Sequence, residues 1–358
     1  MSSPSSDQAL SEQSLGWLDG LDTAFEQAAA NRIIEHFYSI AGRPLRVRFA
    51  GRAIADRFMP ALEHLQSGEA PDDAHIVQVW DAASTDTAEP AVSVPPDSPG
   101  GTVFTHADEG RRALYMVGLR SLNVYDAGAN SSWYWTADAA RLPAWECASP
   151  LRHLLHWWLA ANGLQQVHAG AIGTDGGAVL VVGRGGRGKS TTTLAGLGAG
   201  LKYVGDDYVA VETKDRPLVH SIYNAGKLEP HHLERFPVLR EHATIDPPGL
   251  DGDFEQPKAV VYVHAQFPKQ TVSTLPLVGI VVPTIAAGRT ALVPAARAEA
   301  LRALAPSTLL QLHVGEQGLL TSLTALVARL PAYTLRLGDD LERVGPLIAS
   351  VIDGSADG

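Results

Sequence analysis

The stretch AVLVVGRGGRGKSTTTLAGLGAGLKYVGDDYVAVE, residues 178–212, carries most of the information about the fold. Its apolar start, Ala178–Val182, predicts a buried strand, and Lys189–Leu197 has the composition of a helix. Between them, Gly183–Ser190 fits the pattern GxxxxGK[ST] at every fixed position. A strand, a glycine-rich loop and a helix in this order are typical of a loop that binds phosphate groups.

The chemistry of such a loop explains its residue types. Glycines let the backbone wrap tightly, so that successive N–H groups point at phosphate oxygens, and the helix dipole adds positive charge. Lys189 would reach the β- and γ-phosphates, and the Ser190 hydroxyl would hold Mg²⁺. Arg184 and Arg187 either add charge near the phosphates or are simply solvated. We predict that ATP binds to nine residues: Gly183, Arg184, Gly185, Gly186, Arg187, Gly188, Lys189, Ser190 and Thr191.

Three ionisable residues accompany the loop at short range. Asp206 and Asp207 follow Lys189 by 17 and 18 residues, and His168 precedes it by 21. If the flanking segments are adjacent strands of one sheet, these side chains converge at the loop. Transfer of phosphate to a hydroxyl needs one carboxylate to take the proton and another to help hold the metal. The alternatives are a solvated turn for the acidic pair and a buried structural histidine for His168.

The residues before the loop indicate a separate, smaller domain. We expect a disordered leader over 1–12, a mixed and mostly β domain over 13–145, and an α/β domain over 146–358. Apolar spacing predicts a helix over Leu15–Ala41, and strands follow at Leu45–Phe49 and His75–Trp80. The aromatic run Trp133–Trp135 is either sheet packing, which we favour, or a binding platform.

Alternating strands and helices predict an α/β domain built on a central sheet in the second part. We expect single continuous strands at Gln166–Ile172 and Tyr203–Val211, and a helix near Leu228–Phe236. On such a helix, the adjacent His231 and His232 would face different ways and make poor joint ligands. Further helices are expected near 296–304, 319–330 and 341–352, and strands near 259–263, 277–282 and 333–337.

Charge and hydropathy exclude several functions. The formal net charge is −11, whereas nucleic acids and anionic membranes require a basic face. The most apolar run, Leu275–Ala287, contains two prolines and is shorter than the roughly 20 residues of a membrane-spanning helix. The polar N-terminal sequence has no pattern of a secretory signal. We therefore expect a cytoplasmic protein without nucleic-acid or membrane partners; the sequence leaves a homo-oligomer open.

The layout of Val167–Glu212 resembles the catalytic domain of the bacterial HPr kinase/phosphorylase family, a relative of the phosphoenolpyruvate carboxykinases. VHAGAIG, the glycine loop and the acidic pair stand at that family's mutual spacing. The resemblance implies a phosphate-loop domain of that fold, with Asp207 as the base and Asp206 supporting the metal. It also implies that His168 and Lys189 take part in the chemistry, together with the acidic pair. The segment that supports phosphorolysis in that family, and its catalytic arginine, have no clear counterpart here.

More loosely, the whole chain resembles HPr-kinase-related serine kinases associated with lasso-peptide biosynthesis. The shared segments are Val79–Asp81, Pro143–Glu146, His156–Leu159, Ser221–Leu228, Leu304–Thr308 and Leu330–Gly338. This likeness implies a peptide or protein acceptor with a serine hydroxyl, such as a lasso-type precursor peptide.

These observations together predict an ATP- and Mg²⁺-dependent kinase that acts on a hydroxyl. The predicted catalytic residues are Asp207, His168 and Lys189, and the predicted metal ligands are Ser190, Asp206 and Glu229. Lys227 could touch phosphate, or be helix-start charge near a solvated turn. The alternatives are a nucleotide-binding regulator or scaffold without turnover, and a small-molecule kinase of the same fold.

Overall fold

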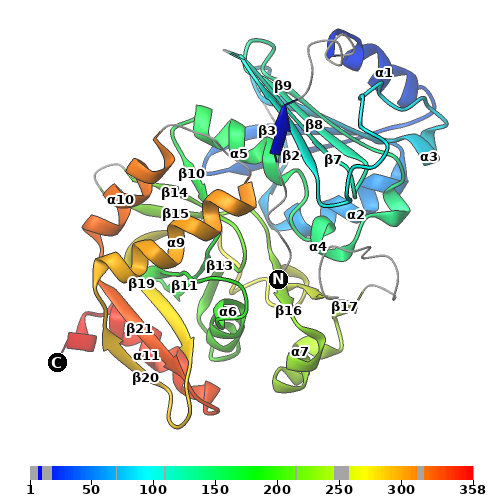
Figure 1. The fold of residues 1–358 in the computed structure, drawn as a ribbon. Coiled ribbons are helices and arrows are strands. Elements are labelled where there is room, and N and C mark those ends of the chain that lie inside the picture. Colours follow the sequence, from blue (N-terminus) through cyan, green and yellow to red (C-terminus); the bar gives the residue numbers. More distant parts are fainter. Residues whose placement is uncertain are drawn as a thin grey trace. The chain divides into compact units, whose positions relative to one another are not determined.

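The computed structural model of the chain describes residues 7–9, 18–69, 71–108, 110–213, 216–245, 258–312 and 318–357. These residues form a mixed α/β protein with several sheets, divided into two compact units. The first unit comprises the chain up to Pro60 and Leu65–Ala161. The second comprises Ala61–His64, Asn162–Ile245 and the chain from Lys258 onward (Figure 1). The boundary between the two units therefore lies after the end of α5 (Arg152–Ala161), whereas the sequence predicted a domain boundary at 145.

The first unit is built on one sheet. The order of its nine described strands is β1 (Asp7–Ala9), β6 (Val103–Ala107), β7 (Arg111–Met116), β8 (Ser121–Asp126), β9 (Ser131–Thr136), β5 (His75–Asp81), β3 (Arg43–Ala50), β2 (Ile33–Ile40) and β4 (Gln66–Ser67). Its α-helices are α1 (Leu21–Ala28), α2 (Arg52–Leu62), α3 (Ala82–Thr85), α4 (Ala144–Cys147) and α5. Trp133 and Trp135 are buried in the cluster that packs α1 against the sheet, so the aromatic run packs a sheet, as we favoured.

The helix predicted over Leu15–Ala41 is wrong in its second half. α1 ends at Ala28, and Ile33–Ile40 is strand β2, paired antiparallel with β3. The turn between them has Ala41 and Gly42 at φ of 54° and 74°, as a two-residue type I′ hairpin requires. Pairing with β3 outweighs the helical spacing of the apolar residues. Of the leader predicted over 1–12, Asp7–Ala9 is a strand paired with β6, and the remainder lies outside the described residues.

The second unit has a mixed central sheet. Its strands are β10 (Gln165–Val167), β14 (Val209–Glu212), β15 (Leu218–Ser221), β19 (Thr274–Ile285), β12 (Gly177–Val181), β11 (Gly170–Thr174) and β13 (Lys202–Gly205), in that order, with β21 (Ala332–Leu337) beside β19 and β20 (Ala291–Pro294) beside β21. A smaller sheet holds β16 (Ala225–Leu228), β18 (Ala259–Tyr262) and β17 (Thr244–Ile245).

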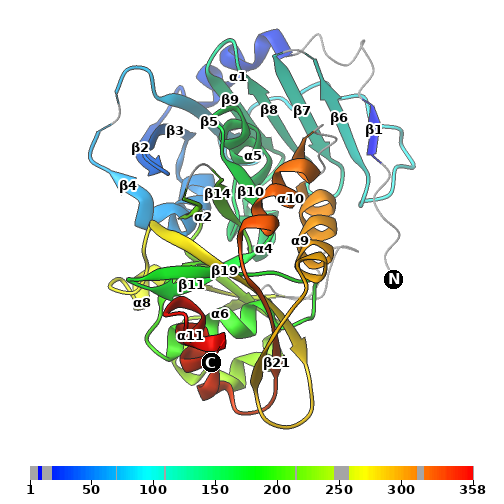
Figure 2. The same cartoon turned by 90° about the vertical axis from the view of Figure 1, so that its left-hand side faces the viewer.

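Helices cover both faces of this central sheet. Leu180 and Val182 pack in the cluster that contains α9 (Arg297–Leu312) and α10 (Leu319–Arg329). Val179 and Val181 pack in the cluster of α6 (Lys189–Gly198) and α11 (Val344–Ile352). Figures 1 and 2 show these two helix pairs on opposite faces of the sheet. Successive side chains of a strand point to opposite faces of the sheet, and here helices cover both faces. β12 is therefore apolar at every position and buried throughout.

Shorter helical segments complete the second unit. They are η5 (Pro230–Arg235), α7 (Pro237–Arg240), α8 (Val263–Gln266), η6 (Leu341–Arg343) and η7 (Ser355–Asp357). None of the helices in the described part of the chain has the length and apolar character needed to cross a membrane.

Candidate functional site

The glycine-rich loop connects the buried strand β12 to helix α6. Gly186 and Gly188 have φ of 72° and 97°, a backbone region that favours glycine. A Cβ on Gly188 would also lie 2.5 Å from Leu337 Cδ1. Helix α6 starts directly after the loop, where the Thr192 N–H donates to the Gly188 carbonyl at 2.9 Å. The predicted strand, loop and helix are therefore confirmed as local structure.

Lys189 is buried at the start of α6 and turns back into the loop. Its Nζ donates to the Gly183 carbonyl at 2.9 Å. Burial lowers the pKa of Lys189, and the negative charges of Asp207 and Asp206 oppose that change. An ammonium that is buried against a carbonyl is poorly compensated, so an anion entering the loop would stabilise its charged form. The loop thus has the chemistry to bind phosphate.

The remaining loop residues differ in exposure. Arg184 and Arg187 are exposed, Ser190 is half-buried and Thr191 is buried in the first turn of α6.

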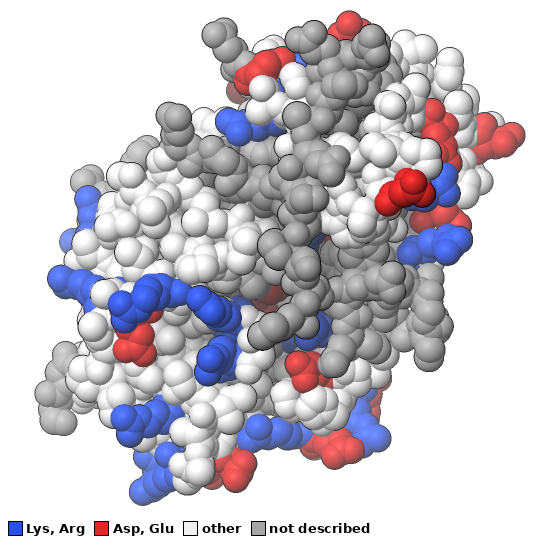
Figure 3. Space-filling model, viewed as in Figure 1, with Lys and Arg blue, Asp and Glu red and all other residues white. Residues whose placement is uncertain are grey.

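On the face shown in Figure 3, Lys and Arg side chains gather over the region of α9, β20 and β21. The second unit therefore presents positive charge to solvent although the chain is acidic overall, and such charge attracts anions.

Asp206 lies against the first turns of α6. Its Oδ1 accepts from Thr193 Oγ1 at 2.6 Å, and its Oδ2 accepts from the Lys227 amide at 3.0 Å. Burial raises the pKa of Asp206, and the charge of Asp207 raises it further. Hydrogen bonds from Lys227, Thr193 and the Ser190 hydroxyl lower it in part. Ser190 and Asp206, two predicted metal ligands, are thus brought together, and both offer the oxygen atoms that Mg²⁺ prefers.

Asp207 is held between two basic side chains. His168 Nε2 lies 2.8 Å from Oδ1, and Lys227 Nζ donates to Oδ2 at 2.9 Å. Burial on its own would raise the pKa of Asp207, but Lys227 and His168 outweigh it and hold this pKa well below its usual range. The environments of the two adjacent carboxyl groups therefore push their pKa values apart, a pattern common among groups with different roles in a site.

His168 is fixed from several directions. Its backbone N–H donates to Thr308 Oγ1 on α9 at 3.1 Å. Its ring stacks on Tyr208, with ring centroids 5.2 Å apart, and the Tyr208 hydroxyl donates to Gln311 at 3.3 Å. Its Nδ1 is buried with no hydrogen-bond partner among the described residues. The imidazole is consequently oriented toward Asp207 by packing and by its backbone.

Breaks in two strands place these residues opposite each other. The continuous strands predicted over Gln166–Ile172 and Tyr203–Val211 are both interrupted, the first after Val167 and the second after Gly205. On one side of the breaks β10 pairs with β14, and on the other β11 pairs with β13. Strand pairing is interrupted between these two pairs of strands. His168 and Asp207 lie in this interruption, where their side chains meet.

Close packing at Gly170 fixes the distance between this gap and α6. A Cβ there would lie 2.5 Å from Thr193 Cγ2 and 2.9 Å from the Asp206 carbonyl oxygen. Thr193 is a site contact that sequence reasoning missed, whereas Thr308 lies in the segment Leu304–Thr308, which the sequence resemblance includes. A usable signal was present for Thr193, because it lies four residues after Lys189 and so on the same helix face.

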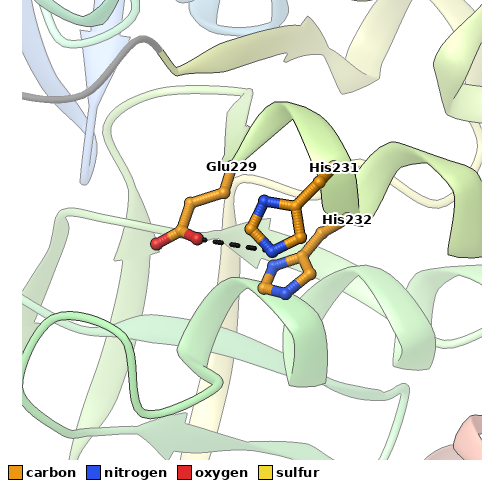
Figure 4. A group of neighbouring side chains, drawn as sticks. All are labelled: Glu229, His231 and His232. Atoms are coloured by element: carbon orange, nitrogen blue, oxygen red, sulfur yellow. Dashed lines mark ion pairs between the residues drawn. The ribbon is translucent and has the colours of Figure 1, made fainter.

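Glu229 has neighbours other than Ser190 and Asp206. Its Oε2 lies 3.7 Å from His231 Nε2, and its Oε1 lies 3.8 Å from Lys258 Nζ. The helix predicted over Leu228–Phe236 is replaced by the end of β16 and the 3₁₀ helix η5. The expectation that His231 and His232 face different ways is wrong, because their ring centroids lie 4.1 Å apart. Figure 4 shows Glu229 beside both rings.

No protein-family model matches the sequence, and the comparison with curated proteins gives no match. Among solved structures, the chain is similar to the Hpr(Ser) kinase/phosphatase from Coxiella burnetii, with 11% sequence identity. The alignment covers 53% of this chain and 95% of that chain, with a TM-score of 0.28. A TM-score this low supports no inference about fold or function, so function has to be inferred from the geometry of the site itself.

Proposed function

We propose that the chain is a kinase that transfers the γ-phosphate of ATP to a hydroxyl group, with Mg²⁺ as its metal. The observation that carries this proposal is the hydrogen bond of 2.6 Å between Thr193 and Asp206. It joins the acidic pair to the helix that begins at the glycine-rich loop. Phosphate-binding groups, oxygen ligands and a carboxylate base are thereby collected within one compact unit, as phosphoryl transfer requires.

The loop residues would bind and orient the nucleotide. The loop amides and Lys189 would hold the phosphates, and Ser190 and Asp206 would hold the metal. Bound Mg²⁺ would neutralise charge that develops on the phosphate oxygens. Lys189 is poised for this role because its buried ammonium has the Gly183 carbonyl as its hydrogen-bond acceptor at 2.9 Å.

Asp207 would receive the proton of the acceptor hydroxyl. Its low pKa keeps it ionised, and a carboxylate has about four acceptor positions, so contacts from His168 and Lys227 leave room for a further donor. Its side chain is 24% exposed and therefore within reach of an acceptor. Proton transfer to Asp207 would accompany formation of the bond between the acceptor oxygen and the γ-phosphorus. The bond from the γ-phosphorus to the β–γ bridging oxygen would break, and ADP would leave, while His168 and Lys227 keep the carboxylate in place.

Only the sequence resemblance supports a more specific proposal for the fold and for the acceptor. It favours a phosphate-loop domain of the HPr kinase type and a serine of a peptide or protein, such as a lasso-type precursor, as the acceptor. A nucleotide-binding regulator without turnover is the second candidate. The ion pairs of Asp207 favour it, because they make this carboxylate a weak base.

The test is transfer from γ-labelled ATP to a serine-containing precursor peptide, with Asp207→Asn as the variant. Asparagine keeps the shape of the side chain but removes the base. We expect transfer to fall by about 10²–10⁴, while a non-hydrolysable ATP analogue still binds. Transfer by Asp207→Asn at the wild-type rate would exclude this residue as the base. Nucleotide binding by wild type without transfer to any peptide or small hydroxyl compound would favour the regulator.

A further inference from the structure

Three potential metal-binding side chains converge where β16 gives way to η5. Glu229 is the residue before this 3₁₀ helix, and His231 and His232 lie within it. One ligand atom from each of the three lies within 4.8 Å of the others. Figure 4 shows the carboxylate and the two rings side by side. The His232 amide donates to the Glu229 carbonyl at 2.9 Å, so the backbone itself fixes the spacing of the ligands.

The distances are close to those of a metal centre. Ligand atoms of a tetrahedral zinc ion, with bonds of about 2.0–2.1 Å, lie roughly 3.3 Å from one another. Glu229 Oε2 and His231 Nε2 are already 3.7 Å apart. The His231 side chain is 69% exposed, so its ring can rotate to shorten the longer separations.

The donor set selects the kind of ion. Two imidazoles and a carboxylate suit zinc, cobalt and nickel, whereas Mg²⁺ and Ca²⁺ prefer oxygen ligands. From these contacts we propose that Glu229, His231 and His232 bind a divalent transition-metal ion of the Zn²⁺ type. Three protein ligands leave at least one coordination position for water or a small anion. The site is separate in composition from Ser190 and Asp206, which we assign to the Mg²⁺ of the nucleotide.

Lys258 tunes the affinity of this site. Its Nζ lies 3.8 Å from Glu229 Oε1, while the other carboxylate oxygen, Oε2, faces His231. The carboxylate can therefore contact the ammonium and a metal ion through different oxygens. A bound dication would nevertheless be repelled by the ammonium, so removing this charge strengthens metal binding.

The experiment is a titration of the nucleotide-free full chain with Co²⁺, followed by its d–d absorption, and with Zn²⁺ by calorimetry, both in excess Mg²⁺. We expect one ion per chain. His231→Ala and His232→Ala should each weaken binding at least about tenfold, the lower bound for loss of an outer partner of a metal ligand. His242→Ala is the matched control, because this histidine is exposed and outside the trio; it should bind like wild type.

Lys258→Gln provides a gain of function that a merely structural role would not produce, and it should bind Zn²⁺ more tightly than wild type. The proposal is overturned if no saturable binding occurs up to millimolar metal, or if His231→Ala and His232→Ala bind like wild type. It is also overturned if Lys258→Gln fails to tighten binding. Because no nucleotide is present, its failure would leave the proposed kinase function untouched.

Discussion

Replacing Lys227 by methionine isolates the ion pair that controls Asp207. The substitution removes the ammonium 2.9 Å from Asp207 Oδ2 and keeps a side chain of similar length. The backbone N–H of residue 227 still donates to Asp206, so the neighbouring carboxylate keeps its partner. The perturbation therefore acts on Asp207 through charge.

The size of the effect follows from the geometry. An opposite charge this close lowers a carboxyl pKa by about 1–3 units, so its removal should raise the pKa of Asp207 by a similar amount. Burial, which already raises this pKa, would then be opposed mainly by His168. The measurement is a pH titration of the Asp207 carboxyl ¹³C resonance in wild type and Lys227→Met. Lys258→Gln serves as the control, because its ammonium lies against Glu229.

Stability should change with pH in the same variant. Because the folded-state pKa of Asp207 is depressed, its contribution is present above the unfolded value of about 3.9 and is lost as pH falls through the folded value. The free energy of unfolding measured with urea at pH 7 should therefore be about 1–4 kcal/mol higher for wild type than for Lys227→Met, since one unit of pKa is about 1.4 kcal/mol. This difference in the free energy of unfolding should shrink toward pH 3. An unchanged Asp207 titration in Lys227→Met would refute this electrostatic account.

Two other substitutions separate metal support from packing. Asp206→Asn should raise the Mg²⁺ concentration needed to bind an ATP analogue, and an identical Mg²⁺ dependence would argue against a metal role. Gly170→Ala should cost about 1–3 kcal/mol, because its Cβ would lie 2.5 Å from Thr193 Cγ2. The melting temperature should then fall by roughly 2–4 °C per kcal/mol. Gly198→Ala, with no atom within 4 Å of its Cβ, should melt no lower than wild type, and equal melting of all three proteins would contradict the packing account.

Local sequence predicted the strand, loop and helix around Gly183–Ser190, because their signals lie within a few residues. The hairpin of β2 and β3 was harder to predict. The spacing of Ile33 and Phe37 fits a helix, and only pairing with β3 decides the outcome. The same limit applies to the strand breaks beside His168 and Asp207, since a one-dimensional pattern does not show where a ladder opens.

The other contacts of the site could not be predicted, because they join elements that lie far apart in the sequence. Lys227 lies on β16 in the smaller sheet, and its ion pair with Asp207 depends on how that sheet packs beside α6. Thr308 lies 140 residues after His168, so its hydrogen bond has no local signature. The pairing of His231 with His232 depends on a 3₁₀ helix where the sequence pattern favoured an α-helix.

Nucleotide binding at the glycine-rich loop is the central claim, and calorimetry with an Mg²⁺-bound, non-hydrolysable ATP analogue tests it most directly. Lys189→Met removes a charge-assisted hydrogen bond worth about 1.5–3 kcal/mol, so affinity should fall roughly 10- to 100-fold. Lys202→Met, which removes an exposed ammonium that donates to the Lys269 carbonyl, should bind like wild type. Equal affinity of wild type and Lys189→Met, or no binding by wild type, would contradict the account.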